Sequence, residues 1–131
     1  MQLERVLLVD DEPDIRRIGP VRLQAVGKLL VTLASSGAEA LELARLHRPD
    51  AILLDVMMPE MDGPACLASL KSSEETRHIP VLFMTAKVQN QEIDRYLALG
   101  AVGVIRKPFD PMTLAQDLRA LLEAAEARRG K

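Results

Sequence analysis

The sequence predicts an α/β fold in which one parallel β-sheet is covered by helices on both faces. Two observations favour this fold: short apolar runs alternate with longer amphipathic segments, and most of the runs are continuous. A short continuous apolar run suits a strand that is covered on both faces, as the strands of parallel sheets usually are. Strands that alternate with helices in this way form repeated βαβ units and therefore a parallel sheet.

Five apolar runs are the expected strands, and four of them are continuous rather than alternating. In chain order they are Val6–Val9, Leu29–Leu33, Ala51–Leu54, Val81–Met84 and Ala101–Ile105.

Helical patterns occupy the segments between these runs. The first helix is expected to begin near Pro13, because proline is favoured in a first turn. Pro20 falls inside the same segment and removes a backbone donor there, so the helix should kink or break. The second pattern, Gly37–Leu46, has Leu41 and Ala44 on its inward side.

The ends of the helices carry the expected residues. Gly27, Gly100 and Gly130 stand where helices should stop. Asp110, just before a proline, is a plausible N-cap for the last helix. That helix has the clearest apolar stripe, formed by Leu114, Leu118, Leu121, Leu122 and Ala125.

The length of 131 residues suits one domain, and we expect residues 1–131 to form it. Hydrophobic residues make up 48% of the chain, enough for a core that needs no disulfide or structural metal. We expect that core to span about residues 4–125, with a frayed polar end at 126–131. Cys66 is the single cysteine, which excludes an internal disulfide and a cysteine-rich zinc site. It should be a small buried apolar side chain.

Charge and aromatic content narrow the class of partner. The formal net charge of −2 gives no bias toward nucleic acid or anionic membranes. With aromatic residues at 2%, there is no platform on which single-stranded nucleic acid could stack. The apolar run near the N-terminus is too short for a signal peptide, and no stretch approaches the ~20 apolar residues that span a bilayer. We therefore expect a cytoplasmic location.

Reactive side chains follow four of the five predicted strands. Asp10 and Asp11 end the first strand, Asp55 the third, Thr85 the fourth and Lys107 the fifth. In a doubly wound parallel sheet, ligands bind outside the carboxyl ends of the strands. These side chains should therefore meet at one edge of the sheet.

Three crowded carboxylates repel one another, which would raise their pKa values or require a bound cation. Mg²⁺ suits such oxygen ligands and needs few of them from the protein. With the charge offset, one carboxylate can act as a nucleophile and form an aspartyl phosphate. Lys107 and the Thr85 hydroxyl can then bind phosphoryl oxygens. Asp10, Asp11, Asp55 and Lys107 each fit an ordinary structural role alone, but four such residues at one edge are poorly explained by coincidence.

Four motifs in this order resemble the receiver domain of bacterial two-component response regulators. They are VLLVDDEP at 6–13, ILLDVMMPEMDG at 52–63, FMTAK at 83–87 and KPF at 107–109. The resemblance covers about residues 4–125. It implies a flavodoxin-like (βα)5 fold with a five-stranded sheet of order 2-1-3-4-5.

The resemblance also implies a role for each residue of the cluster. Asp55 is the phosphoacceptor. Asp11, Asp55 and the Met57 backbone carbonyl bind Mg²⁺ directly, and Asp10 contributes through water. Lys107 contacts the phosphoryl group, and Thr85 is the switch hydroxyl that moves toward it. The phosphoryl donor would be a phosphohistidine on a histidine kinase or a phosphotransfer protein.

One departure from the family pattern concerns the output step. The family usually has an aromatic residue three positions before the lysine, and here that position is Val104. The coupling of a threonine to an aromatic ring cannot take its usual form. Val102 and Val104 are candidates for contact with an unknown downstream protein, and we expect a monomer or a weak dimer.

Two other functions stay open on sequence grounds. One is an enzyme on the same kind of fold, such as a flavin electron carrier or a phosphatase, but no Ser/Thr/Gly-rich phosphate loop follows the first strand. The other is a receiver-like interaction module that works without phosphorylation, which the intact Asp11, Asp55, Thr85 and Lys107 argue against. The sequence favours a signalling domain that accepts a phosphoryl group, with no catalysis beyond its own phosphorylation and dephosphorylation.

Overall fold

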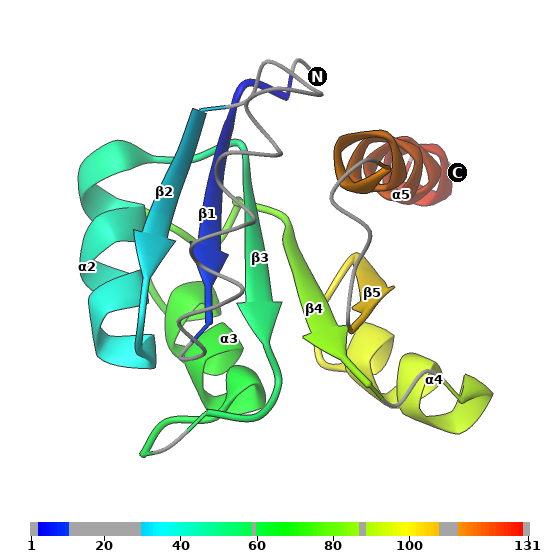
Figure 1. Cartoon of the computed structure of the whole chain (residues 1–131), viewed down its shortest axis with the longest axis horizontal. Coiled ribbons are helices and arrows are strands. Elements are labelled where there is room, and N and C mark those ends of the chain that lie inside the picture. The colour runs from blue at the N-terminus through cyan, green and yellow to red at the C-terminus, as the bar shows by residue number, and fades with distance from the viewer. Residues whose placement is uncertain (1–2, 11–29, 59, 87–88, 108–112, 130–131) are drawn as a thin grey trace.

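The computed structural model describes residues 3–10, 30–58, 60–86, 89–107 and 113–129. These residues form a five-stranded parallel sheet of order β2-β1-β3-β4-β5, the order that the resemblance implies (Figure 1). The strands are β1 (Arg5–Val9), β2 (Leu30–Ala34), β3 (Ala51–Asp55), β4 (Val81–Thr85) and β5 (Gly103–Arg106). All five predicted strands are confirmed, with small shifts at their ends.

Four helices lie within the described residues: α2 (Gly37–His47), α3 (Gly63–Lys71), α4 (Asn90–Ala98) and α5 (Leu114–Arg129). The first predicted helix, with Pro13, Pro20 and Gly27, lies outside the described residues, as do Asp110 and Gly130. Among the α5 side chains whose burial is described, the last buried one is Ala125. None of the helices described is both long and apolar enough to cross a membrane.

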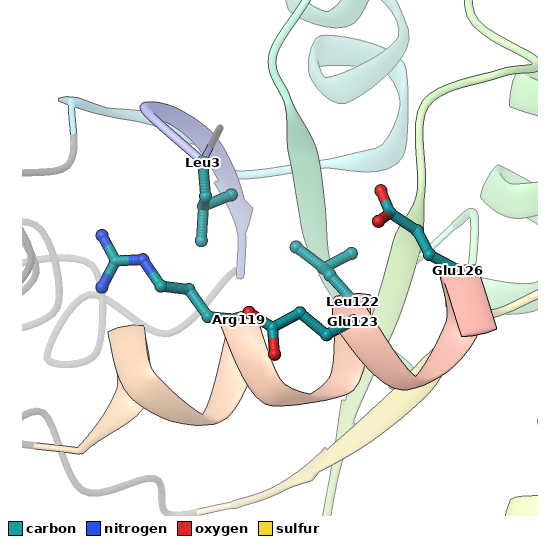
Figure 2. A pocket seen from close by; sticks show the side chains of 5 residues that line it. All are labelled: Leu3, Arg119, Leu122, Glu123 and Glu126. Atoms are coloured by element: carbon teal, nitrogen blue, oxygen red, sulfur yellow. The ribbon is translucent and has the colours of Figure 1, made fainter. Parts of the chain in front are cut away.

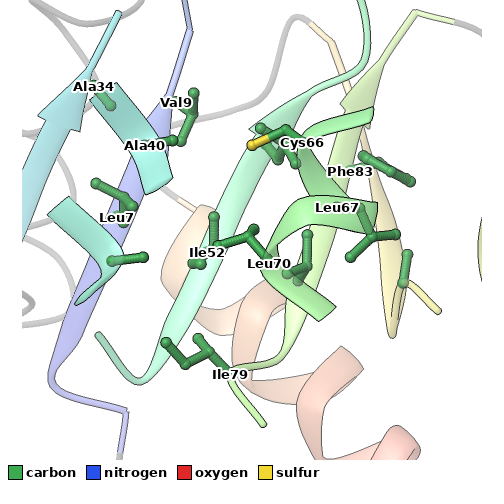
Figure 3. Close-up of a cluster of buried hydrophobic side chains, with 14 of the residues drawn as sticks. Leu7, Val9, Ala34, Ala40, Ile52, Cys66, Leu67, Leu70, Ile79 and Phe83 are labelled. Atoms are coloured by element: carbon green, nitrogen blue, oxygen red, sulfur yellow. The ribbon is translucent and has the colours of Figure 1, made fainter. Parts of the chain in front are cut away.

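The helices cover both faces of the sheet, as predicted. Side chains of α2, α3 and α4 pack into one hydrophobic cluster, and side chains of α5 pack into the other. β3 supplies both clusters because successive side chains of a strand point to opposite faces: Ile52 and Leu54 join the first, and Leu53 joins the second. Figure 3 shows the first cluster, where Cys66 is buried as predicted.

Local signals explain where the helices begin and end. The Ser36 hydroxyl caps α2 by accepting the Glu39 N–H at 3.2 Å, and the Asp62 carboxylate caps α3 by accepting the Ala65 N–H at 2.9 Å. Gly100 follows α4 with φ +114°, a left-handed conformation that favours glycine and confirms it as a stop signal.

β5 begins two residues later than predicted. The Ala101 N–H donates to the Tyr96 carbonyl at 3.2 Å, so Ala101 still belongs to the turn that closes α4. The apolar run from Ala101 therefore mixes a helix-terminal turn with a strand, a distinction that periodicity alone does not make.

Candidate functional site

The carboxyl ends of four strands bring together four of the predicted site residues. Asp10 follows β1 directly, and its N–H donates to the Ala34 carbonyl at 3.0 Å. Asp55 and Thr85 are the last residues of β3 and β4. Lys107 follows β5, and its N–H donates to the Thr85 carbonyl at 2.9 Å. Asp11, also a predicted site residue, lies outside the described residues.

The ammonium group of Lys107 lies between two buried carboxylates. Its Nζ is 3.3 Å from Oδ2 of Asp10 and donates a hydrogen bond to Oδ2 of Asp55 at 3.2 Å. Asp10 is 0% exposed and Asp55 is 3% exposed, while the Lys107 side chain is 13% exposed. Asp10 and Asp55 are the only charged side chains among the described buried residues. Their interactions with each other and with Lys107 are strong, because charges attract and repel more strongly away from water.

The environment of Asp55 raises the pKa of its carboxyl group above the ordinary value of 3.8. Burial is the largest cause, because it disfavours the charged form. The Lys107 ammonium opposes this shift, and the neighbouring Asp10 carboxylate adds to it. The Met57 N–H donates to Oδ1 of Asp55 at 3.2 Å, which also favours the charged form. One lysine thus does not fully offset two buried carboxylates.

Thr85 lies at the same edge but on a different face of its strand. It comes two residues after Phe83, so both side chains belong to the face covered by α3 and α4. Asp55 is paired in register with Met84, whose side chain packs in the cluster on the α5 face. The Thr85 side chain therefore lies on the α3 and α4 face of the sheet, whereas Asp55 lies on the α5 face.

Gly63 shapes the loop that follows Asp55, and the sequence reasoning assigned it no role. Its N–H donates to the Val56 carbonyl at 2.9 Å. A Cβ added at Gly63 would lie 2.8 Å from the Asp55 carbonyl oxygen, 2.9 Å from Cα of Val56 and 3.0 Å from Cε1 of Phe83. Only glycine fits this approach of α3 to the end of β3. Gly63 follows the N-cap residue Asp62 and is the first residue of α3, where glycine is not needed for capping. This position is the sequence signal that could have identified Gly63 as a close-packing residue.

The chemistry of the donors fits a small hard divalent cation. Asp10 and Asp55 offer carboxylate oxygens, and the backbone carbonyl of Met57 follows in the same loop. No cluster of three His, Cys, Asp or Glu side chains occurs among the residues that the structure describes, and Asp11 is not among them.

A separate hollow of about 260 Å³ lies against α5, next to the start of β1 (Figure 2). Leu3 and Leu122 form its apolar part, and Arg119, Glu123 and Glu126 form its charged part. The charged residues Arg119, Glu123 and Glu126 are typical of a solvated helix face. None of the predicted site residues lines the hollow.

Comparison with known proteins agrees with this geometry. The family model for the response regulator receiver domain matches residues 6–119. The chain is 39% identical over 119 residues to a probable transcriptional regulator, ycf27, of Guillardia theta. The aligned region covers 91% of this chain and 45% of the relative. It is 36% identical over 125 residues to the alkaline phosphatase synthesis transcriptional regulatory protein PhoP of Bacillus subtilis, covering 94% of this chain and 50% of the relative. The chain spans about half the length of these curated relatives.

Solved structures give the same result. The chemotaxis response regulator CheY4 of Vibrio cholerae superposes with a TM-score of 0.83 at 33% identity, covering 92% of this chain and 99% of that one. The N-terminal domain of a response regulator receiver protein from Methanoculleus marisnigri superposes with a TM-score of 0.74 at 35% identity, covering 94% and 96%. The family match, the sheet order and the cluster at the strand ends agree, and the chain belongs to the response regulator receiver domain family of two-component signalling systems.

Proposed function

We propose that Asp55 accepts a phosphoryl group from a phosphohistidine donor, with Mg²⁺ bound beside it, and that this charge change switches a protein-binding surface. The observation that carries the proposal is the position of Lys107, whose Nζ is 3.3 Å from Asp10 and 3.2 Å from Asp55 at the carboxyl edge of the sheet. A lysine held there is positioned to contact a phosphoryl oxygen on Asp55.

The metal would be held by Asp11, Asp55 and the Met57 backbone carbonyl, with Asp10 contributing through water. Bound Mg²⁺ would offset the negative charge of the carboxylates and of the phosphoryl oxygens. The buried Asp10 and Asp55, which share the Lys107 ammonium group, are the residues that need such an offset.

The chain's own residues then position the reacting atoms. An oxygen of the Asp55 carboxylate forms a bond to phosphorus while the phosphorus–nitrogen bond of the donor breaks. The histidine nitrogen keeps the electron pair and takes up a proton, which leaves a neutral imidazole. Lys107 and Thr85 bind phosphoryl oxygens as charge moves onto the new group, so that catalysis consists mainly of positioning and charge stabilisation.

The donor in this proposal is a histidine kinase or a phosphotransfer protein, and the target is a downstream protein that reads the switched surface. We further propose that residues 1–131 act as one receiver domain, as a monomer or weak dimer in the cytoplasm.

The test is to incubate the protein with acetyl phosphate and Mg²⁺ and to measure its intact mass. We expect one phosphoryl group on the wild type, no addition in Asp55→Asn, and loss of the addition when EDTA is present from the start. Asp94→Asn, an exposed aspartate on α4, is the matched control and should be phosphorylated like the wild type. If the folded wild type takes up no phosphoryl group, the proposal is wrong and a receiver-like interaction module that works without phosphorylation replaces it.

A further inference from the structure

The helix α4 buries a single side chain, the ring of Tyr96, which is 3% exposed. This ring meets the ring of Phe83 in β4 edge to face, with 5.0 Å between the centroids and 64° between the planes. Edge-to-face ring pairs attract each other beyond the apolar area that they bury. The main side-chain anchor of α4 on the sheet is therefore an aromatic contact with β4.

Phe83 also approaches the main chain of the acceptor, through Gly63. Its Cε1 would be 3.0 Å from a Cβ added at Gly63, and the same Cβ would be 2.8 Å from the Asp55 carbonyl oxygen. Figure 3 shows the Phe83 side chain beside α3, within the same packed cluster as Leu67. Gly63 thus lies against both the main chain after Asp55 and the Phe83 ring, so a shift of that main chain would press on the ring.

Thr85 and Val104 lie on the same face as Phe83. Thr85 follows Phe83 by two residues, and Val104 is the partner of Phe83 in the register of β4 and β5. Val104 is half-buried against the cluster that contains Tyr96. In the proposed function Thr85 binds a phosphoryl oxygen, and a movement of its side chain toward Asp55 would leave space on this face. Val104 has no ring that could fill the space, whereas Tyr96 places a large ring against Phe83.

We propose that Tyr96 is a positioning residue that carries the phosphorylation-dependent movement of Thr85 to α4, through its edge-to-face contact with Phe83. The inference rests on the proposed function, because it needs a phosphoryl group on Asp55. In this inference the aromatic residue of the switch is Tyr96 on α4, because the position in β5 that is usually aromatic in the family is Val104.

The surface of α4 would register such a movement. The Arg95 guanidinium lies 5.4 Å from the centroid of the Tyr96 ring and is 3.9 Å from the Glu92 carboxylate. A displaced ring changes the position of this cation and of its ion pair, both of which face solvent. The output surface would thus differ between the two states in shape and in charge.

The first test uses the fact that the chain has one tyrosine and no tryptophan. Tyrosine fluorescence therefore reports on Tyr96 alone. We expect this signal to change when acetyl phosphate and Mg²⁺ are added, and to return as the phosphoryl group is hydrolysed. Asp55→Asn, treated in the same way, should show no change. An unchanged Tyr96 signal in protein that intact mass shows to be phosphorylated would overturn the inference and leave the proposed function standing.

The second test compares hydrogen exchange of the α4 amides with and without phosphorylation. In the wild type we expect the exchange rates to differ by at least about fivefold, the lower range of allosteric coupling. Tyr96→Ala should still be phosphorylated, but its ratio should fall close to one, while Tyr96→Phe should keep the ratio of the wild type. Leu70→Ala on α3 removes a buried side chain of the same cluster and is the control for a simple cavity. It should keep the ratio.

Two outcomes of the second test contradict the inference. One is a full ratio in Tyr96→Ala, and the other is an equal loss in Leu70→Ala. If Tyr96→Ala does not fold, Tyr96→Phe and the wild-type fluorescence decide alone. Failure of the wild type to take up any phosphoryl group is a different result, since it overturns the proposed function itself.

Discussion

Replacing Lys107 by methionine tests whether one lysine stabilises two buried carboxylates. Methionine keeps most of the apolar stem but removes the ammonium group that lies 3.3 Å from Asp10 and 3.2 Å from Asp55. Removing one partner of a buried ion pair costs about 3–5 kcal/mol, because a charge is left uncompensated. Since the Lys107 side chain is still 13% exposed, we expect a loss at the lower end of that range, about 3 kcal/mol in the free energy of unfolding at pH 7 without Mg²⁺.

The loss should depend on pH in a definite direction. Lys107 lowers the pKa of the Asp55 carboxyl group, so its removal raises that pKa further above 3.8. A raised folded-state pKa destabilises the fold only where the unfolded chain would be ionised, which is above pH 3.8. The difference between variant and wild type should therefore shrink as the pH falls toward that value and grow as the pH rises.

The assay is urea unfolding followed by far-ultraviolet circular dichroism at several pH values, with and without Mg²⁺. Saturating Mg²⁺ should recover part of the loss at pH 7, because a cation would again lie near the carboxylates. Arg106→Met, one residue earlier and exposed, is the matched control and should change stability little. A loss of equal size at every pH, without recovery by Mg²⁺, would refute this reasoning and indicate that the charge of Lys107 does not stabilise the two carboxylates.

Three further predictions follow from the same geometry. Without Mg²⁺, Asp55→Asn should be more stable than the wild type at pH 7, because the raised pKa makes ionised Asp55 unfavourable in the fold; the gain should vanish below about pH 3.8 in the same urea titrations. Gly63→Ala should lower the free energy of unfolding by about 1–3 kcal/mol in thermal or urea unfolding, because its Cβ would meet main-chain atoms. Gly103→Ala should lose less stability, because its Cβ would meet the flexible Leu121 side chain at 3.2 Å. Equal losses in the two variants would contradict this explanation. Burial raises the pKa of the Cys66 thiol to about 11, so the folded protein should react with a disulfide reagent at pH 7 only as fast as it unfolds; rapid reaction in native buffer would contradict the buried position.

The sheet could be predicted from sequence because short continuous apolar runs such as Ala51–Leu54, separated by helical patterns, are typical of strands covered on both faces. These runs also end where the carboxylates and the lysine stand, so the edge that gathers Asp10, Asp55 and Lys107 followed from topology. The order of the strands came from the family resemblance, since no single strand specifies its neighbours.

Contacts between elements could not be predicted in the same way. The fit of Gly63 against the end of β3, and the meeting of the Tyr96 and Phe83 rings, depend on how α3 and α4 lie on the sheet. Periodicity identifies the buried side of a helix but does not identify its partner on the sheet. The predictions about Asp11 and Pro20 concern residues that the structure does not describe, and they stay predictions.

The most direct test of the central claim locates the phosphoryl group itself. Protein treated with acetyl phosphate and Mg²⁺ is reduced with borohydride, which converts an aspartyl phosphate to homoserine, and is then digested and sequenced by mass spectrometry. We expect homoserine at position 55 and at no other aspartate. Homoserine at Asp10 or Asp11 with Asp55 unmodified, or none in folded protein, would contradict it.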